Sequence, residues 1–196
     1  MSDEPASLSQ HAVDDLRFIR EAMERASSFT SIPGWGGMLI GVTAVAASVV
    51  ASDRLPSTRP WLTVWLLEAA VAALIGAATM ALKAGRTQSP FMSGAARRFF
   101  ISYGAPMFAG AALSFALLRR GQFETLPAVW LILYGCAFVS SGAFSLRVIP
   151  IMGVAFMILG VCAVPLDLPA GNVVLGAGFG GLHLIFGFII GRNHGG

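Results

Sequence analysis

Three polar side chains lie inside otherwise apolar stretches of this sequence, and they are its clearest candidates for chemistry. Glu68, Tyr134 and His183 each belong to a different stretch. If these stretches are helices that cross a bilayer in the same direction, a rise of 1.5 Å per residue puts the three groups about 12, 12 and 16 Å below one end. An ionisable group at such a depth is costly, and by default it marks a functional site.

Two interpretations of these residues follow. In the first, Glu68 is the carboxylate of a proton or substrate site, His183 is its partner and Tyr134 is a donor. In the second, the three groups form a structural hydrogen-bond network that fixes helix register, with each bond worth about 0.6 kcal/mol. Ala72 and Gly76 follow Glu68 at helical spacing. Small residues of this kind are enriched where membrane helices pack, so we expect Glu68 to point into the protein.

The sequence lacks the motifs of common catalytic and nucleotide-binding sites. It contains no P-loop, no HExxH, no GxSxG and no paired carboxylates within one apolar stretch. Residues 176–181 match GxGxxG, but they lie inside an apolar stretch rather than between a strand and a helix. Cys136 and Cys162 are typical of small buried hydrophobic residues. We therefore expect no enzymatic activity, no cofactor and no metal site.

The composition is that of a membrane protein. Of the 196 residues, 56% are hydrophobic and only 12% are charged, whereas soluble domains carry about 25% charged residues. The mean hydropathy is +0.74. The net charge of +3 does not indicate nucleic-acid binding, because the basic residues cluster at the ends of the apolar stretches.

Six apolar stretches position the three polar groups, and most are long enough to cross a bilayer as helices. They cover residues 35–51, 60–82, 99–118, 126–145, 150–165 and 172–191. The sequence therefore predicts an all-α polytopic bundle of six transmembrane helices over residues 34–196. Residues 1–33 are expected to form a cytoplasmic tail and an amphipathic helix.

Small and aromatic residues suggest how the helices pack and where they end. Glycines at helical spacing let the backbones of two helices approach closely. We expect helix-packing positions at Gly37, Gly41, Gly76, Gly135, Gly142, Gly176, Gly180 and Gly187. Tryptophans near expected helix ends are typical of the aromatic belt at a membrane interface. These are Trp35, Trp61, Trp65 and Trp130.

Residues 9–27 have the pattern of an amphipathic helix. Leu16, Ile19 and Met23 fall on one apolar stripe. The polar face carries both signs of charge, which suits a protein partner better than an anionic lipid surface. We interpret the stripe as a contact surface for another protein or a second copy of the chain. The alternative is a solvated helix whose stripe packs on its own chain.

The distribution of Lys and Arg predicts the orientation in the membrane. With six crossings, both termini share one side with the loops that follow the second and fourth helices. That side carries Arg17, Arg20, Arg25, Lys83, Arg86, Arg97, Arg98, Arg147 and Arg192, and the other carries Arg54, Arg59, Arg119 and Arg120. Nine basic residues against four predict that both termini are cytoplasmic.

Three runs carry a resemblance to known proteins. They are DLRFIREAMERASSFTSIPGWGG, WLILYGCAFVSSGAFSLRVIPIMG and GFGGLHLIFGFIIG. Together they resemble a family of uncharacterised bacterial membrane proteins with an N-terminal cytoplasmic arm and six spans. The layout is also distantly similar to HdeD-type membrane proteins. The resemblance implies a multi-pass protein of the bacterial inner membrane, and it implies no activity.

The functional expectation is a non-enzymatic integral membrane protein that acts as a structural, regulatory or partner subunit. The alternative is a small proton-linked transporter or channel that uses the Glu68, Tyr134 and His183 network. A cavity that reaches Glu68 would favour transport, whereas a fully packed interior would favour the structural role.

Overall fold

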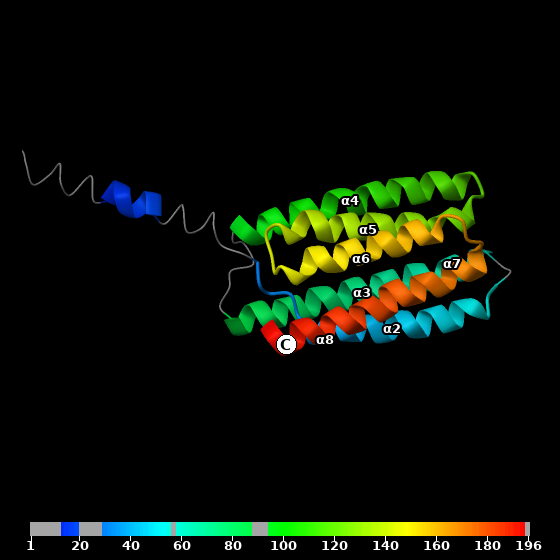
Figure 1. The fold of residues 1–196 in the computed structure, drawn as a ribbon, viewed down its shortest axis with the longest axis horizontal. Helices are drawn as coiled ribbons and strands as arrows, with labels where there is room; N and C mark the ends of the chain where they lie inside the picture. The colour runs from blue at the N-terminus through cyan, green and yellow to red at the C-terminus, as the bar shows by residue number, and fades with distance from the viewer. Residues whose placement is uncertain (1–12, 20–28, 56–57, 88–93, 195–196) are drawn as a thin grey trace, which may run out of the picture.

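The computed structural model describes residues 13–19, 29–55, 58–87 and 94–194, and these are almost entirely helical. Residues 13–19 form a short helix that precedes the labelled elements. In chain order the elements of Figure 1 are α2 (Gly34–Ser52), α3 (Thr58–Thr87), α4 (Gly94–Arg119), the 3₁₀-helix η1 (Phe123–Thr125), α5 (Leu126–Gly142), α6 (Val148–Ala163), α7 (Leu168–Leu175), the π-helix η2 (Gly176–Leu182) and α8 (His183–His194).

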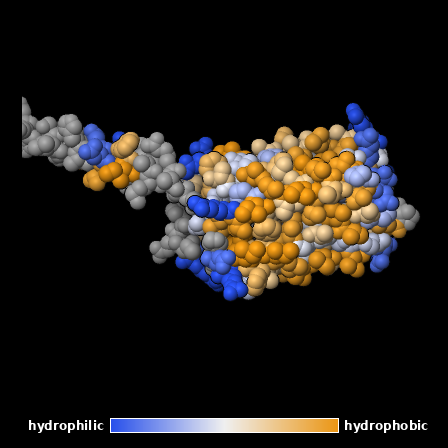
Figure 2. Space-filling view, viewed as in Figure 1, coloured by the Kyte–Doolittle hydropathy of each residue, from blue (hydrophilic) through white to orange (hydrophobic). Residues whose placement is uncertain are grey.

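The all-helical prediction is confirmed for the described residues, and each of the six apolar stretches is helical. Five helical segments are long and apolar enough to cross a membrane. One of them joins α7, η2 and α8 into a single segment, Leu168–Asn193. The sixth helix, α6, is apolar but shorter. Figure 2 shows a broad hydrophobic band across the face of the bundle in view, with hydrophilic residues gathered at its two ends.

The helices form two groups of three. In Figure 1, α4, α5 and α6 lie together on one side, and α2, α3 and α7–α8 lie together on the other. Within the first group α5 packs extensively against both α4 and α6. Within the second group α2 packs extensively against both α3 and α8. The molecule is therefore a pair of three-helix layers, and the space between them decides what it can bind.

Glycines allow the closest helix contact in each group. In the first, a Cβ atom at Gly135 would lie 2.5 Å from the carbonyl oxygen of Gly153, and one at Gly142 would lie 2.5 Å from Pro150 Cδ. A larger residue has no room there, because the neighbouring atoms belong to backbone or to a proline ring. The short connection between α5 and α6 and this close approach together produce a tight antiparallel hairpin.

Glycines also allow the close packing of α2 against η2 and α8 in the second group. A Cβ atom at Gly41 would meet the carbonyl oxygen of Gly180 at 2.8 Å, and one at Gly187 would meet the amide nitrogen of Met38 at 2.7 Å. The remaining expected positions on this interface also approach their neighbours, with Gly37 facing Gly187 and Gly176 facing Ser48. Gly76 differs, because its nearest neighbour is Ile40 Cδ1 at 3.9 Å, an ordinary contact.

A short entry segment, residues 29–33, leads into α2 and ties the two groups together at the end near the C-terminus. The Phe29 amide donates to the carbonyl oxygen of Phe144 (2.7 Å), and the Ser145 hydroxyl donates to the carbonyl oxygen of Phe29 (2.7 Å). Lys83 Nζ of α3 donates to the carbonyl oxygen of Ile32 (3.0 Å). Apolar side chains from both groups surround this segment and close that end of the bundle.

The helix at residues 13–19 exposes its apolar side chains. Leu16 is 67% exposed and Ile19 is 53% exposed. Met23, the third residue of the expected partner-contact stripe, lies outside the described residues, as does most of the predicted arm.

Candidate binding cavity between the helix groups

A cavity of about 1310 Å³ lies between the two groups. Its walls come from α2, α3, α4, α5, α6, η2 and α8, and most of its surface is apolar. Along one side it is bordered by α3 and α4, which do not pack extensively against each other. Glu68, Tyr134 and His183 all line it. The three residues singled out from the sequence therefore belong to one site.

Glu68 projects from α3 at its interface with α2. Its Oε1 accepts a hydrogen bond from Thr43 Oγ1 at 2.8 Å. The Thr43 hydroxyl also lies 2.9 Å from the carbonyl oxygen of Ile40, one turn earlier on α2. Because a hydroxyl has a single proton, it donates to one of these acceptors at a time. Among the described residues, Oε2 of Glu68 has no hydrogen-bond partner, so it is available to the cavity.

Tyr134 of α5 and His183 of α8 form a hydrogen-bonded pair that joins the two helix groups across the cavity wall. Tyr134 Oη lies 2.9 Å from His183 Nε2, and His183 Nδ1 lies 2.8 Å from the carbonyl oxygen of Phe179. A carbonyl oxygen only accepts, so Nδ1 carries the proton of the neutral ring and Nε2 accepts from Tyr134. The side chain of His183 is almost completely buried.

The π-helix η2 explains why the His183 ring reaches that carbonyl. In a regular α-helix the amide of His183 would donate to the carbonyl oxygen of Phe179. Here that amide donates to Gly180 instead, and the imidazole bonds to Phe179. Single π-turns inside α-helices occur often at functional sites. The glycine-rich run 176–181 that matched GxGxxG forms this turn.

Aromatic rings surround the Tyr134–His183 pair. The ring centroid of Tyr134 lies 4.7 Å from that of Phe138, 4.9 Å from that of Phe156 and 5.0 Å from that of Phe179. All three contacts are edge-to-face, the arrangement in which a positive ring edge meets a negative face. These contacts hold the tyrosine hydroxyl in one direction.

The structure does not join the three predicted groups into a single hydrogen-bond network. Tyr134 and His183 bond to each other, whereas Glu68 bonds to Thr43. The reason is the helix arrangement, because α3 packs on α2 and leaves an open cavity between Glu68 and the α5–α8 pair.

A second polar cluster was not predicted, and it lies at the far end of the bundle. Asn172 is fully buried, and its Oδ1 accepts from the indole nitrogens of Trp61 (2.9 Å) and Trp65 (2.8 Å). Its Nδ2 donates to the carbonyl oxygen of Ser48 and to the hydroxyl of Ser52, both at 3.0 Å. The four hydrogen bonds use the full capacity of the side-chain amide.

This cluster corrects the interpretation of two tryptophans. Trp61 and Trp65 are 0% and 3% exposed, so they are interior anchors and do not form an interface belt. Trp130 stacks on Trp61 with centroids 5.8 Å apart, and Trp35 is exposed as expected. The W-x-x-x-W spacing was the available signal, because residues four apart share one helix face.

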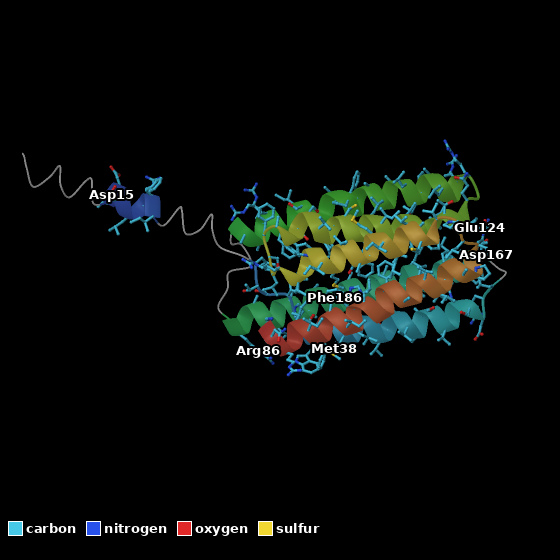
Figure 3. The ribbon with its side chains drawn as sticks, in the orientation of Figure 1. Asp15, Met38, Arg86, Glu124, Asp167 and Phe186 are labelled. Atoms are coloured by element: carbon cyan, nitrogen blue, oxygen red, sulfur yellow. The ribbon has the colours of Figure 1, made fainter. Side chains whose placement is uncertain are left out.

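No group of three or more His, Cys, Asp or Glu side chains that could hold a metal ion occurs in the described part of the chain. Cys136 and Cys162 are free thiols. Figure 3 shows Glu124 and Asp167 at one end of the bundle and Arg86 at the other, so these three charged groups lie away from the middle of the helices.

Comparison with known proteins gives no relative from which an activity could be carried over. No protein-family model, no curated protein and no solved structure matches the chain. The resemblance to six-span bacterial proteins therefore remains a prediction.

Proposed function

We propose that this protein is a small non-enzymatic transporter that binds a substrate in the cavity between its two helix groups. The observation that carries the proposal is the cavity of about 1310 Å³ that Glu68, Tyr134 and His183 line together. Binding sites for small molecules are concave and mostly apolar, with a few polar groups that fix orientation. The cavity has both properties.

The size of the cavity argues against a purely structural role for the polar groups. The cavity is a half-open cleft and not a sealed interior void, and helices packed as closely as a protein interior would leave little such space. Two layers held together only for stability would bring α3 and α4 into contact. Instead, Ala72 and Gly76 on α3 line open space. Space of this size beside a carboxylate suits a protein that must admit a ligand.

The membrane arrangement that supports transport has six crossings, with α6 as the short one, in a bacterial inner membrane. Both termini are cytoplasmic, which the ratio of nine basic residues to four supports. An enzyme reporter that works only in the cytoplasm is then expected to be active when it is fused after His194. If a reporter that works only after export is active at the same position, the orientation is the opposite one.

Transport requires that the cavity opens to each side of the membrane in turn, and cysteine labelling tests this. We would replace Cys136 and Cys162 by Ser and introduce Ala72→Cys, because Ala72 lines the cavity four residues after Glu68. In sealed vesicles of both orientations, a membrane-impermeant maleimide is expected to label this cysteine from either side. The control is Ala44→Cys, whose position is 0% exposed and lies outside the cavity lining. Labelling of position 72 from neither side would refute transport.

A second role, as a partner subunit, is favoured by the exposed apolar face of residues 13–19. Leu16 and Ile19 would contact another protein or a second copy of the chain. A photo-crosslinking residue at position 16 is expected to capture that partner in intact cells, and the change Ile19→Asp is expected to abolish the product. A crosslink that Ile19→Asp leaves unchanged would argue against the contact.

A further inference from the structure

We propose that the substrate is a lipophilic organic cation whose positive charge pairs with Glu68. This inference rests on the proposed function, since it names the class of molecule that the cavity holds.

In the part of the chain that the structure describes, the cavity lining has an acidic side chain and no basic Lys or Arg side chain to balance it. Among the described residues that line the cavity, Glu68 is the one acidic side chain, and the lining includes no Lys or Arg. An ionised carboxylate in apolar surroundings is unfavourable unless a cation or several donors accompany it. The one donor that the described residues provide is the Thr43 hydroxyl. A cationic ligand would supply the positive charge that the described lining lacks, and in its absence a proton would neutralise the carboxylate.

The geometry of Glu68 leaves room for that charge. Thr43 holds Oε1 at 2.8 Å and so fixes the direction of the carboxylate. Oε2 accepts from none of the described residues and can face a ligand. The carboxylate is thus held by the protein through one oxygen and offered to the cavity through the other.

The walls near Glu68 suit a large cation. Trp65 precedes Glu68 by three residues on α3, so both share one helix face, and the small exposed part of Trp65 (3%) borders the cavity. Its Nε1 donates to Asn172, which fixes the ring. Tyr103 and Tyr134 contribute further aromatic surface from α4 and α5. Aromatic faces attract organic cations, and the attraction strengthens when water is excluded.

The volume admits a bulky molecule. Sites for drug-sized ligands measure roughly 300–1,000 Å³, and this cavity is somewhat larger at about 1310 Å³. A cation with several aromatic rings would fill a large part of it. A small inorganic cation would leave most of the apolar wall without contact, so the apolar surface favours a lipophilic ion.

Two ions of nearly the same shape and opposite charge test the proposal directly. Tetraphenylphosphonium and tetraphenylborate would be titrated calorimetrically against the purified full-length protein in nanodiscs of zwitterionic lipid, with empty nanodiscs as the blank. We expect the phosphonium ion to bind at least about tenfold more tightly than the borate, equivalent to about 1.4 kcal/mol.

Variants then assign the preference to one carboxylate. Glu68→Gln keeps the acceptor for Thr43 but removes the charge, so the preference for the phosphonium ion is expected to vanish. Glu68→Asp keeps the charge and is expected to keep the preference. Glu124→Gln is the matched control, because it makes the same change in net charge at the end of the bundle, as Figure 3 shows. It is expected to behave like the wild type.

The outcomes separate this inference from the proposed function. If Glu68→Gln leaves the preference unchanged, or if the wild type binds both ions equally, the cation assignment is wrong. In that case labelling of Ala72→Cys from both sides would still support transport of another class of molecule. If neither ion binds and position 72 is also unreactive, both proposals fail.

Discussion

Asn172→Ala is expected to be among the most destabilising single substitutions that leave the helices themselves intact. The side chain makes four hydrogen bonds, to Trp61, Trp65, Ser48 and Ser52. At an average of about 0.6 kcal/mol for a hydrogen bond between membrane helices, the four contribute about 2.4 kcal/mol. The substitution also leaves two buried indole N–H groups without an acceptor, and each such group costs about 1–3 kcal/mol. The two figures describe the same lost hydrogen bonds and are not summed, so we expect a loss of about 2–6 kcal/mol in the free energy of unfolding.

The assay is reversible unfolding in mixed micelles of increasing SDS fraction, followed by far-ultraviolet circular dichroism. Circular dichroism avoids the tryptophan signal, which the substitution itself will change because Trp61 and Trp65 lose their partner. Asn193→Ala is the matched control, since Asn193 is exposed near the end of α8. That change is expected to stay within about 0.5 kcal/mol of the wild type.

A double-mutant cycle with Trp65→Phe tests the hydrogen bond between Trp65 and Asn172. Alone, Trp65→Phe removes one hydrogen bond and is expected to cost about 0.6 kcal/mol or somewhat more. In the Asn172→Ala background the same change removes an indole N–H that no longer has an acceptor. The combined loss should therefore be smaller than the sum of the two single losses. Strict additivity, or a loss below about 0.5 kcal/mol for Asn172→Ala, would refute the hydrogen-bond cluster.

Two further predictions concern the helix contacts and the histidine pair. Gly135→Ala is expected to destabilise by about 1–3 kcal/mol, because the new methyl group would meet the backbone of Gly153. Gly104→Ala, which has open space around its Cβ, should be neutral or stabilising by up to about 1 kcal/mol. The same SDS titration compares the two, and equal losses would contradict the contact. Tyr134→Phe removes the donor to His183 Nε2 and is expected to cost about 0.6 kcal/mol. An unchanged ¹⁵N chemical shift of that nitrogen would contradict the bond.

The helices were predictable because apolar length is a strong signal. An uninterrupted apolar run satisfies its backbone only as a helix inside a bilayer, so each of the six runs is helical. The boundaries extend beyond the apolar runs where polar residues continue the helix. Thus α3 reaches Thr87, although its apolar stretch was expected to end at residue 82. Hydropathy alone does not predict that the helix continues through that extra turn.

The cavity was not predictable from residue types. Ala72 and Gly76 on α3 were interpreted as packing positions, because small residues allow a second helix to approach. In the structure the same small side chains border open space. A small residue is compatible with close contact and with a void, and only the position of the opposing helix decides between them.

The residues of the candidate site were likewise only partly predictable from the sequence. The apolar surroundings of Glu68 in the sequence single it out as a candidate, but its partner Thr43 lies on the neighbouring α2 helix, and that contact depends on how the two helices are rotated. The bond from Tyr134 to His183 depends on the π-turn, which shifts the register of the last span. Asn172 was overlooked because an asparagine near a helix start is usually a capping residue. Here Asp167 caps α7, and Asn172 points inward.

The contact between α2 and α8 has a consequence for synthesis. These helices lie at opposite ends of the chain, and the entry segment residue Phe29 likewise bonds to Ser145, which is 116 residues later. Because α3, α4, α5 and α6 lie between them in the chain, α2 meets α8 only after those helices have been synthesised. Until then the glycine face of α2, including Gly41, is covered by lipid or by a chaperone. A chain that stops before α8 would leave the glycine face of α2 without this partner helix.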